Sequence, residues 1–230
     1  LGILLDGDGD RVGFADEKGN IWLGDIILLL LIREIIPKNS GRKVIVEVKD
    51  SEAVVEETKR LDGIPIFWKT GHALLDHKVF EEKAILCGEM SCHYWITDNW
   101  YYFDDAIFAL ARVLEIISDS GKSLSKLVAE LPKYEATPEY RLGCPEDKKF
   151  KLVKELVEYF RPKCHKIVDV DGIRGYIEDG WFLIRASNTQ PLIVVRCEAK
   201  TKSGLEKIKK LIKNKLDEYP YIRLDWQKQS

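Results

Sequence analysis

Short apolar runs alternate with helix-length segments along the first 120 residues. Four runs predict β-strands, the first of them buried, at residues 1–5, 43–48, 64–67 and 83–87. Three segments predict helices that begin at capping side chains: Asp25 for residues 25–36, Ser51 for residues 51–61, and Asp104 or Asp105 for a helix ending near 118. Residues 37–42 have the composition of a linker. Strands that alternate with helices predict an α/β layer with parallel strand pairing.

The remaining sequence has a different order of elements. Two amphipathic helices are predicted by the apolar sets Phe150, Val153, Leu156, Val157, Phe160 and Leu205, Ile208, Leu211, Ile212, Leu216. Between them, strands are predicted at residues 165–170, 173–177, 181–184 and 192–197, with a tight turn at Asp179–Gly180. Helix, antiparallel strands and helix indicate a separate α+β domain from about residue 142 onward.

Composition limits the classes of function. The chain is 45% hydrophobic and 32% charged, which excludes a disordered chain, and its net charge of -2 gives no footprint for nucleic acid or an anionic membrane. The longest apolar run, residues 26–32, is far shorter than the roughly 20 residues that cross a bilayer. Five scattered cysteines without a C-x-x-C pair indicate a reducing cytoplasm. Because the sequence starts at Leu1 and its single methionine is Met90, we expect it to be part of a longer protein or a processed form.

Three aspartates alternate with glycines directly after the first predicted strand, in the sequence D-G-D-G-D-R. Asp6, Asp8 and Asp10 can face one centre, because the glycines permit the required backbone angles. Three carboxylates suit Mg²⁺, which keeps further positions for water or phosphate. An EF-hand would place Glu17 at loop position 12, but it also needs a helix where this chain has a strand. A solvated Asx turn is the structural alternative, and the alternation followed by Arg11 favours metal.

Two polar loops follow later strands. The sequence K-T-G-H ends at His72, and G-E-M-S-C-H ends at His93. Both lie beyond the carboxyl end of a predicted strand, where open α/β sheets bind ligands. Glu89 and Ser91 offer acceptors for sugar hydroxyls, and the two histidines can donate to phosphate or exchange protons near neutral pH. A structural or merely exposed role is the alternative for each histidine.

A fourth motif, R-A-S-N-T-Q-P, lies between two strands of the second domain, at residues 185–191, with Arg196 downstream. Its arginine fork matches phosphate oxygens, and the hydroxyls and backbone N–H groups can supply further donors. A polar hairpin loop is the alternative. Beside an aspartate-rich metal loop, the motif favours a phosphate cradle.

Together, these motifs resemble the α-D-phosphohexomutase superfamily, specifically its bacterial-type phosphomannomutases/phosphoglucomutases. The resemblance covers essentially the whole chain in the family's motif order. D-G-D-G-D-R resembles the metal loop, W-K-T-G-H at residues 68–72 matches closely, G-E-M-S-C-H resembles the sugar loop G-E-M-S-G-H, and R-A-S-N-T-Q-P resembles the phosphate loop R-x-S-N-T-x-P.

The resemblance implies a role for each matching residue. The residues implied to bind Mg²⁺ are Asp6, Asp8 and Asp10. The residues implied at the reacting groups are Arg11, beside the transferring phosphate, with Lys49 and His72 for proton handling. The residues implied to bind substrate are Glu89 and Ser91 at the 3- and 4-hydroxyls, His93, and Arg185, Ser187, Asn188 and Thr189 at the non-reacting phosphate.

The resemblance also implies the architecture: a mixed-sheet α/β domain followed by an α+β antiparallel-sheet C-terminal domain. The family has four domains. By this comparison, residues 1–37 end domain 2 and carry the metal loop, residues 38–141 form the sugar-binding domain 3, and residues 142–230 form the phosphate-binding domain 4. The family's phosphoserine loop, which resembles T-A-S-H-N-P, has no counterpart here. We therefore expect the phosphoserine to lie in an N-terminal part outside this chain, and the chain alone to be inactive.

The reaction implied is interconversion of hexose 1-phosphate and 6-phosphate through a bisphosphate, with mannose or glucose phosphates as partners and no nucleic acid or membrane. Met90 favours hexose phosphates, because phosphoglucosamine mutases usually carry Gln there. A phosphoglucosamine mutase fragment and a non-catalytic, sugar-phosphate-binding half of a split enzyme are the alternatives. Two residues depart from the family's pattern: Cys92 replaces a glycine, which we expect to narrow or strain the sugar loop, and Ala106 replaces the glycine of D-D-G.

Overall fold

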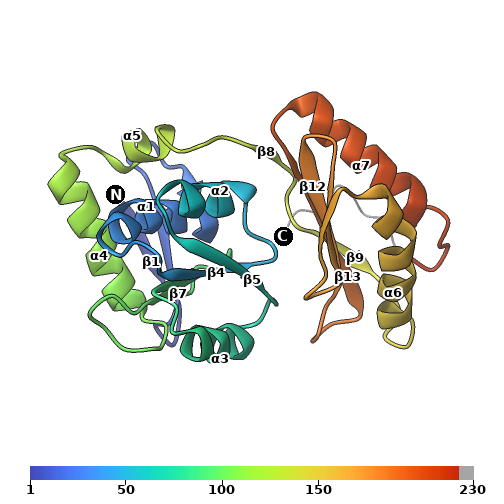
Figure 1. Cartoon of the computed structure of the whole chain (residues 1–230), viewed down its shortest axis with the longest axis horizontal. Coiled ribbons are helices and arrows are strands. Elements are labelled where there is room, and N and C mark those ends of the chain that lie inside the picture. The colour runs from blue at the N-terminus through green and yellow to red at the C-terminus, as the bar shows by residue number, and fades with distance from the viewer. Residues whose placement is uncertain (223–230) are drawn as a thin grey trace. The chain divides into compact units, whose positions relative to one another are not determined.

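A computed structural model of the chain describes residues 1–222. The chain divides into two compact units, Leu1–Pro132 and Lys133–Ser230, which follow one another along the colour bar of Figure 1. The division falls before residue 142, because the short strands β8 (Glu135–Ala136) and β9 (Tyr140–Gly143) pair with a strand of the second unit. The ranges 1–37, 38–141 and 142–230 therefore stay a prediction about the family's domains, and residues 223–230 lie outside the described residues.

The first unit contains two sheets. Their strands are β1 (Gly2–Leu5), β2 (Val12–Ala15), β3 (Ile21–Trp22), β4 (Lys43–Glu47), β5 (Ile64–Trp68), β6 (Leu86–Gly88) and β7 (Tyr94–Ile96). The strands β1, β2 and β3 form an antiparallel sheet in that order. The second sheet has the order β5-β4-β6-β7, in which β4 pairs in parallel with β5 and β6, and β7 is antiparallel. The predicted parallel α/β layer is thus confirmed, with one antiparallel edge strand.

Helices cover both faces of the four-stranded sheet (Figure 1). The helical elements are α1 (Gly24–Ile35), the 3₁₀ helix η1 (Ile36–Lys38), α2 (Glu52–Arg60), α3 (His72–Glu82), α4 (Ala106–Ser120) and α5 (Leu124–Ala129). Cys87 of β6 packs with Leu75 and Val79 of α3. The next residue, Gly88, faces the opposite side, where a Cβ would meet the Leu28 side chain of α1. The unit is therefore a three-layer α/β/α structure.

Two predicted caps are present and one is wrong. Ser51 accepts a hydrogen bond from Ala53 N at 3.2 Å at the start of α2, and Asp105 accepts one from Phe108 N at 2.9 Å at the start of α4. Asp25 does not cap α1. It lies in the first turn, buried, and accepts a hydrogen bond from Ser51 N at 3.1 Å, so its carboxylate joins two helix starts.

The first predicted strand forms as β1, but the expectation that it is buried is wrong. All four residues of β1 are exposed, because β1 is an edge strand with β2 as its neighbour. A run of apolar residues identifies a strand but does not say what packs against it. The helix α3, which begins at His72, has a weak apolar pattern and was not predicted.

In the described part of the second unit, residues 133–222, a six-stranded antiparallel sheet packs with two α-helices, as the α+β prediction requires. The further elements of this unit are α6 (Lys149–Phe160), the 3₁₀ helix η2 (Arg161–Lys163), β10 (Lys166–Val168), β11 (Ile173–Ile177), β12 (Gly180–Ala186), β13 (Leu192–Ala199) and α7 (Lys202–Leu216). Both helices contribute to one core with Phe182, Ile184 and Ala186 of β12. Since neighbouring strand residues point to opposite faces, Arg185 faces away from that core.

Two local predictions in this unit need correction. Phe150 does not belong to the buried face of α6, because it is 58% exposed and Leu152 is buried instead. The tight turn consists of Glu178 and Asp179 rather than Asp179–Gly180, since Ile177 already pairs with Gly180.

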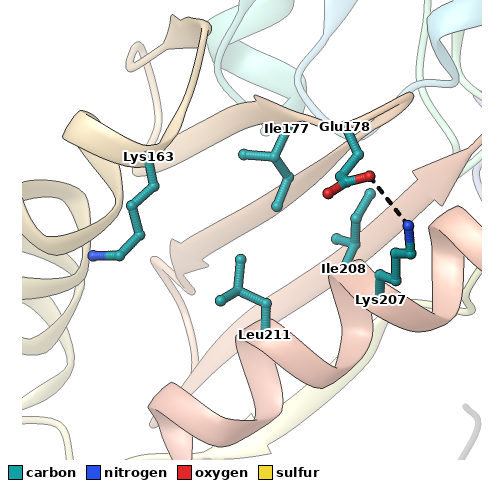
Figure 2. A pocket seen from close by; sticks show the side chains of 6 residues that line it. All are labelled: Lys163, Ile177, Glu178, Lys207, Ile208 and Leu211. Carbon is teal, nitrogen blue, oxygen red and sulfur yellow. Dashed lines mark hydrogen bonds and ion pairs between the residues drawn. The ribbon is translucent and has the colours of Figure 1, made fainter.

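A surface pocket of about 240 Å³ lies beside this turn (Figure 2). Its lining residues are Lys163, Ile177, Glu178, Lys207, Ile208 and Leu211. It adjoins the end of β12 opposite to the R-A-S-N-T-Q-P loop. Among residues 1–222, no helix has the length and apolar character needed to cross a membrane.

Candidate functional site

Three parallel strands of the first unit end at one sheet edge. Glu47 of β4 lies opposite Trp68 of β5, and Val46 lies opposite Gly88 of β6. The residues that follow are Lys49, the K-T-G-H loop and the G-E-M-S-C-H loop, called the sugar loop below. The sheet register therefore brings these polar segments together, as expected for the carboxyl ends of parallel strands.

The aspartate loop is a compact turn held by its own first carboxylate. Asp6 Oδ1 accepts hydrogen bonds from Gly9 N and Arg11 N, each at 3.2 Å, and Arg11 Nε donates to Asp6 Oδ2. Desolvation raises the pKa of Asp6, but hydrogen bonds from Arg11 outweigh it and lower the pKa to about 2. Asp6 is thus ionised at neutral pH and paired with Arg11.

The three carboxylates of the aspartate loop fit a divalent cation. One oxygen from each of Asp6, Asp8 and Asp10 lies within 4.8 Å of the others. Asp10 Oδ1 is buried and accepts no hydrogen bond among the described residues, although Arg11 Nε lies 3.7 Å from it. Burying a carboxylate oxygen without a hydrogen bond is costly, and a hard cation that prefers oxygen ligands would satisfy it.

The aspartate loop and the sugar loop are joined by backbone contacts. Arg11 and His93 form a β-bridge, and Val12 N donates to Cys92 O at 3.1 Å. Gly24, at the start of α1, packs so closely that a Cβ there would lie 1.9 Å from the carbonyl oxygen of Glu89. Because Gly24 has no side chain, the start of α1 can pack directly against the backbone of the sugar loop.

Within the sugar loop, Glu89 is the centre of a hydrogen-bond network. Its Oε2 accepts from Ser91 Oγ at 3.0 Å and lies 2.7 Å from His93 Nδ1, and its Oε1 accepts from Gly71 N at 3.3 Å. Burial raises the pKa of Glu89, but the hydrogen bond and the charge of His93 outweigh this effect. The net shift of the Glu89 pKa is therefore downward. Glu89 is therefore a fixed, buried carboxylate.

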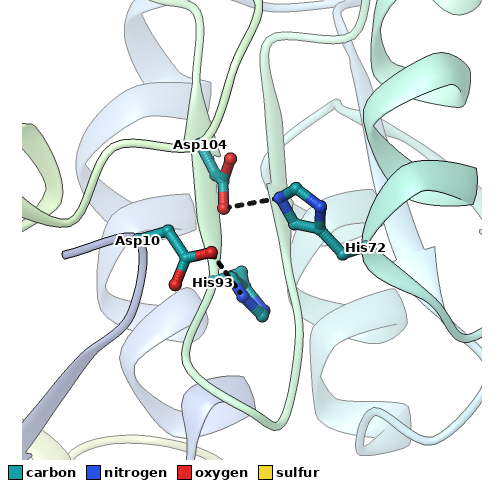
Figure 3. A group of neighbouring side chains, drawn as sticks. All are labelled: Asp10, His72, His93 and Asp104. Carbon is teal, nitrogen blue, oxygen red and sulfur yellow. Dashed lines mark hydrogen bonds and ion pairs between the residues drawn. The ribbon is translucent and has the colours of Figure 1, made fainter. Parts of the chain in front are cut away.

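The two site histidines lie beside each other, with their rings tilted by 46°, near two aspartates (Figure 3). His72 Nε2 lies 2.9 Å from Asp104 Oδ2, and His93 Nε2 lies 3.5 Å from Asp10 Oδ2. The centroids of the two imidazole rings are 4.9 Å apart. The structure thus brings together His72 and His93 with the aspartate loop, which the sequence placed on separate segments.

Sequence reasoning missed two acidic residues here. Glu47 is fully buried: its Oε1 lies 3.1 Å from Lys49 Nζ, and its Oε2 accepts from Met90 N at 3.2 Å. Burial raises the pKa of Glu47, against the opposing charge of Lys49. A charged residue within a β-branched strand was the available signal. Asp104 was considered only as a helix cap.

The second unit presents the R-A-S-N-T-Q-P loop between β12 and β13. Arg185 is buried, and its Nε donates to Asp171 Oδ2 at 2.7 Å. Gly172 makes this possible, since its φ is 71° and a Cβ would lie 2.2 Å from the carbonyl oxygen of Ile184. Ser187 Oγ accepts hydrogen bonds from Thr189 N at 3.3 Å and from Gln190 N at 3.2 Å.

The same loop leaves Asn188 and Thr189 exposed. Lys149 of α6, buried and not singled out from the sequence, donates to the carbonyl oxygen of Gln190 at 3.0 Å. The loop is therefore a rigid turn with an anchored guanidinium at its start and exposed polar groups at its tip.

Two family models match the chain. "Phosphoglucomutase/phosphomannomutase, alpha/beta/alpha domain III" matches residues 23–134, and "Phosphoglucomutase/phosphomannomutase, C-terminal domain" matches residues 124–215. The chain belongs to the phosphoglucomutase/phosphomannomutase family. The two matches span both units and confirm the resemblance of the motifs.

Curated relatives agree with this family. The chain is 38% identical to a phosphomannomutase/phosphoglucomutase of Pseudomonas aeruginosa, over 94% of this chain and 47% of the relative. It is 36% identical to a phosphomannomutase of Methanocaldococcus jannaschii, over 92% and 47%. The chain thus spans about half the length of the curated relatives it matches. These names do not favour the glucosamine-phosphate alternative.

Solved structures share the fold of this chain. A phosphoglucomutase/phosphomannomutase family protein from Burkholderia thailandensis superposes with a TM-score of 0.84 at 35% identity, covering 94% of this chain and 46% of the other. An N-acetylphosphoglucosamine mutase from Aspergillus fumigatus, solved with GlcNAc-6P and magnesium, has a TM-score of 0.67 at 16% identity, covering 92% and 47%; at this identity the likeness concerns the fold alone.

The two departures from the family's pattern occupy different environments. Cys92 adopts a φ of 74°, in the left-handed region that favours glycine, at a conformational cost of about 1–2 kcal/mol. Burial also raises the pKa of its thiol. Ala106 is the first residue of α4 and is buried, in ordinary helical backbone. The strain expected at the sugar loop is therefore located at Cys92.

Proposed function

We propose that this chain supplies the metal, sugar and phosphate loops of a phosphomannomutase/phosphoglucomutase. The parent enzyme would interconvert hexose 1-phosphate and 6-phosphate through a bisphosphate intermediate, with mannose or glucose phosphates as substrates. The observation that carries the proposal is the junction in the first unit, where the Arg11–His93 bridge joins the aspartate loop to the Glu89–Ser91 network.

The sugar loop supports recognition of a hexose. Glu89 and Ser91 would hold the 3- and 4-hydroxyls, and His93 orients the Glu89 carboxylate. Contacts to the 3- and 4-hydroxyls do not distinguish the two configurations at C2. That is a physical reason for accepting both mannose and glucose phosphates.

Phosphoryl transfer needs charge stabilisation near the aspartate loop. Asp6, Asp8 and Asp10 would hold Mg²⁺, which supplies positive charge to the transferring phosphoryl group when bound. Arg11 would contribute further charge beside that group. Lys49 and His72 would manage the proton of the attacking hydroxyl, with His72 oriented by Asp104.

The phosphate that does not react would bind to the second unit. Arg185 offers a guanidinium held by Asp171, and Ser187, Asn188 and Thr189 offer hydroxyl, amide and backbone donors. We further propose that the phosphoserine lies outside this sequence, as the T-A-S-H-N-P comparison indicates. The scattered cysteines are the ground for proposing a cytoplasmic location.

Substrate binding tests the loop assignments directly. Isothermal titration of the 230-residue chain with glucose 6-phosphate and mannose 6-phosphate should detect binding of both sugars. Arg185→Gln should weaken it about tenfold or more, because hydrogen bonds to charged groups contribute about 1.5–3 kcal/mol. Arg161→Gln, at an exposed arginine of η2, is the matched control. Equal affinities of the two variants would contradict the phosphate-loop assignment.

Catalysis tests the proposed place of the nucleophile. The chain alone should convert no mannose 1-phosphate to mannose 6-phosphate in a coupled assay. A preparation of the longer parent should convert it, and Glu89→Gln in that parent should lower kcat/KM. Turnover by the chain alone, free of contaminating enzyme, would refute the claim that the phosphoserine lies outside it.

A further inference from the structure

We propose that Asp10, His72, His93 and Asp104 form a second cation site, which takes a borderline divalent metal ion such as Zn²⁺ or Co²⁺. The four side chains come from four segments: the aspartate loop, the start of α3, the end of the sugar loop, and the segment before α4 (Figure 3). One ligand atom from each lies within 4.8 Å of all the others.

The backbone fixes the positions of two of these ligands. His93 forms a β-bridge with Arg11, the neighbour of Asp10, and Asp104 forms a β-bridge with Trp95. Trp95 is fully buried and its Nε1 donates to Asp76 Oδ1 at 3.0 Å. His93 and Asp104 therefore extend from backbone that is held by β-bridges.

The ligand set differs from that of the aspartate loop. Two imidazole nitrogens with two carboxylate oxygens suit Zn²⁺ and Co²⁺, whereas Mg²⁺ takes oxygen ligands. Metal–ligand bonds of about 2.0–2.2 Å place neighbouring ligand atoms of a tetrahedral site roughly 3.3–3.6 Å apart. His93 Nε2 and Asp10 Oδ2, which are 3.5 Å apart, match that spacing. His72 Nε2 and Asp104 Oδ2 are closer, at a hydrogen-bond distance of 2.9 Å, and would separate slightly around a bound ion.

An outer carboxylate already orients one histidine. His93 Nδ1 lies 2.7 Å from Glu89 Oε2, which directs the opposite nitrogen, Nε2, toward Asp10. Metal-bound histidines in proteins are held in this way, by a carboxylate on the nitrogen that does not bind metal. Glu89 is itself fixed by Gly71 N and Ser91 Oγ.

The second site shares Asp10 with the aspartate loop, and this has a functional consequence. The second site would use Asp10 Oδ2, which lies 3.5 Å from His93 Nε2, while the buried Oδ1 remains for the Mg²⁺ site. One carboxylate would then bridge two divalent cations, and their mutual repulsion should make Zn²⁺ or Co²⁺ weaken Mg²⁺ binding. The inference rests on the side-chain geometry and does not require mutase activity.

Cobalt(II) is the probe, because four-coordinate Co²⁺ has a strong visible absorption that six-coordinate Co²⁺ lacks. Titration of the 230-residue chain with Co²⁺ should produce that absorption with one equivalent bound. His72→Asn should weaken Co²⁺ binding about tenfold or more. His77→Asn, at an exposed histidine of the same helix outside the cluster, should leave it unchanged. His72 is exposed, so its variant should fold, and thermal unfolding checks this.

A magnesium arm separates this proposal from the proposed function. Asp8→Asn should weaken Mg²⁺ binding in calorimetry but retain the cobalt absorption, since Asp8 belongs only to the aspartate loop. His72→Asn should leave Mg²⁺ binding unchanged. Absence of the four-coordinate absorption, or equal cobalt affinities of His72→Asn and His77→Asn, would overturn the second site. Failure of Mg²⁺ to bind would instead count against the aspartate-loop assignment.

Discussion

Gly24→Ala should destabilise the first unit and weaken sugar binding. The new Cβ would lie 1.9 Å from the carbonyl oxygen of Glu89 and 3.1 Å from Cys92 N, and both are backbone atoms that no rotamer change can move. The helix start and the sugar loop must separate by about 1.1 Å to reach 3.0 Å, and by about 1.5 Å for ordinary contact.

The magnitude follows from two opposing contributions. Overpacking costs about 1–3 kcal/mol and more when backbone must shift. Replacing glycine by alanine in a helix returns at most about 1 kcal/mol. We therefore expect a net loss of about 2 kcal/mol, which lowers Tm by roughly 4–8 °C. Because the displaced segment carries Glu89, affinity for glucose 6-phosphate should fall as well.

Calorimetric unfolding and isothermal titration measure the two effects. Gly13→Ala in β2 is the matched control, because its Cβ would lie 3.8 Å from Leu4 Cβ, an ordinary contact. If the unfolding free energies of the two variants agree within about 0.5 kcal/mol, the close approach at Gly24 does not constrain the sugar loop and the reasoning is refuted.

Three further predictions concern other parts of the chain. Asp105→Ala should cost about 1 kcal/mol in urea unfolding, because it removes the cap of α4. Hydrogen bonds from Lys43 and Lys78 lower the pKa of Glu82 from 4.5 to about 2. The ionised Glu82 side chain therefore stabilises the fold above pH 4.5, and this contribution is lost as the pH falls toward 2. The Tm difference between the unsubstituted chain and Glu82→Gln should shrink over that pH range. Gly172→Ala should cost about 2 kcal/mol or more and weaken phosphate binding by Arg185, since its Cβ meets the carbonyl oxygen of Ile184.

Each of these has an outcome that would contradict it. Asp119→Ala is the control for the α4 cap, because Asp119 is an exposed aspartate near the other end of the same helix and its loss should change stability by less than about 0.5 kcal/mol. Equal costs at Asp119 and Asp105 would contradict the capping argument. A constant Tm difference from pH 5 to pH 2 would contradict the ion-pair argument at Glu82. Unchanged phosphate affinity in Gly172→Ala would contradict the positioning of Arg185.

Local chemistry made much of the fold predictable. Ser51 and Asp105 were identified as helix caps because a short acceptor before a helical segment satisfies free N–H groups wherever the rest of the chain lies. The strand at Ile173–Ile177 and the apolar face of α7 follow from their periodicity. Asp25 had the same local signal as Ser51, but a tertiary partner, Ser51 N, took its carboxylate.

The motifs in the sequence identify the candidate site residues, and the fold determines how these residues meet. Glycine spacing indicated that Asp6, Asp8 and Asp10 can converge, because that contact is local. His72 pairs with Asp104 because a β-bridge places Asp104 beside Trp95. Buried Glu47 accepts a hydrogen bond from Met90 N because of the register between neighbouring strands. Such contacts depend on the packing of the whole unit, and the local sequence around either residue does not predict them. The sequence alone therefore determined the family and its loops, and only the tertiary structure decided that two histidines and two aspartates share one site.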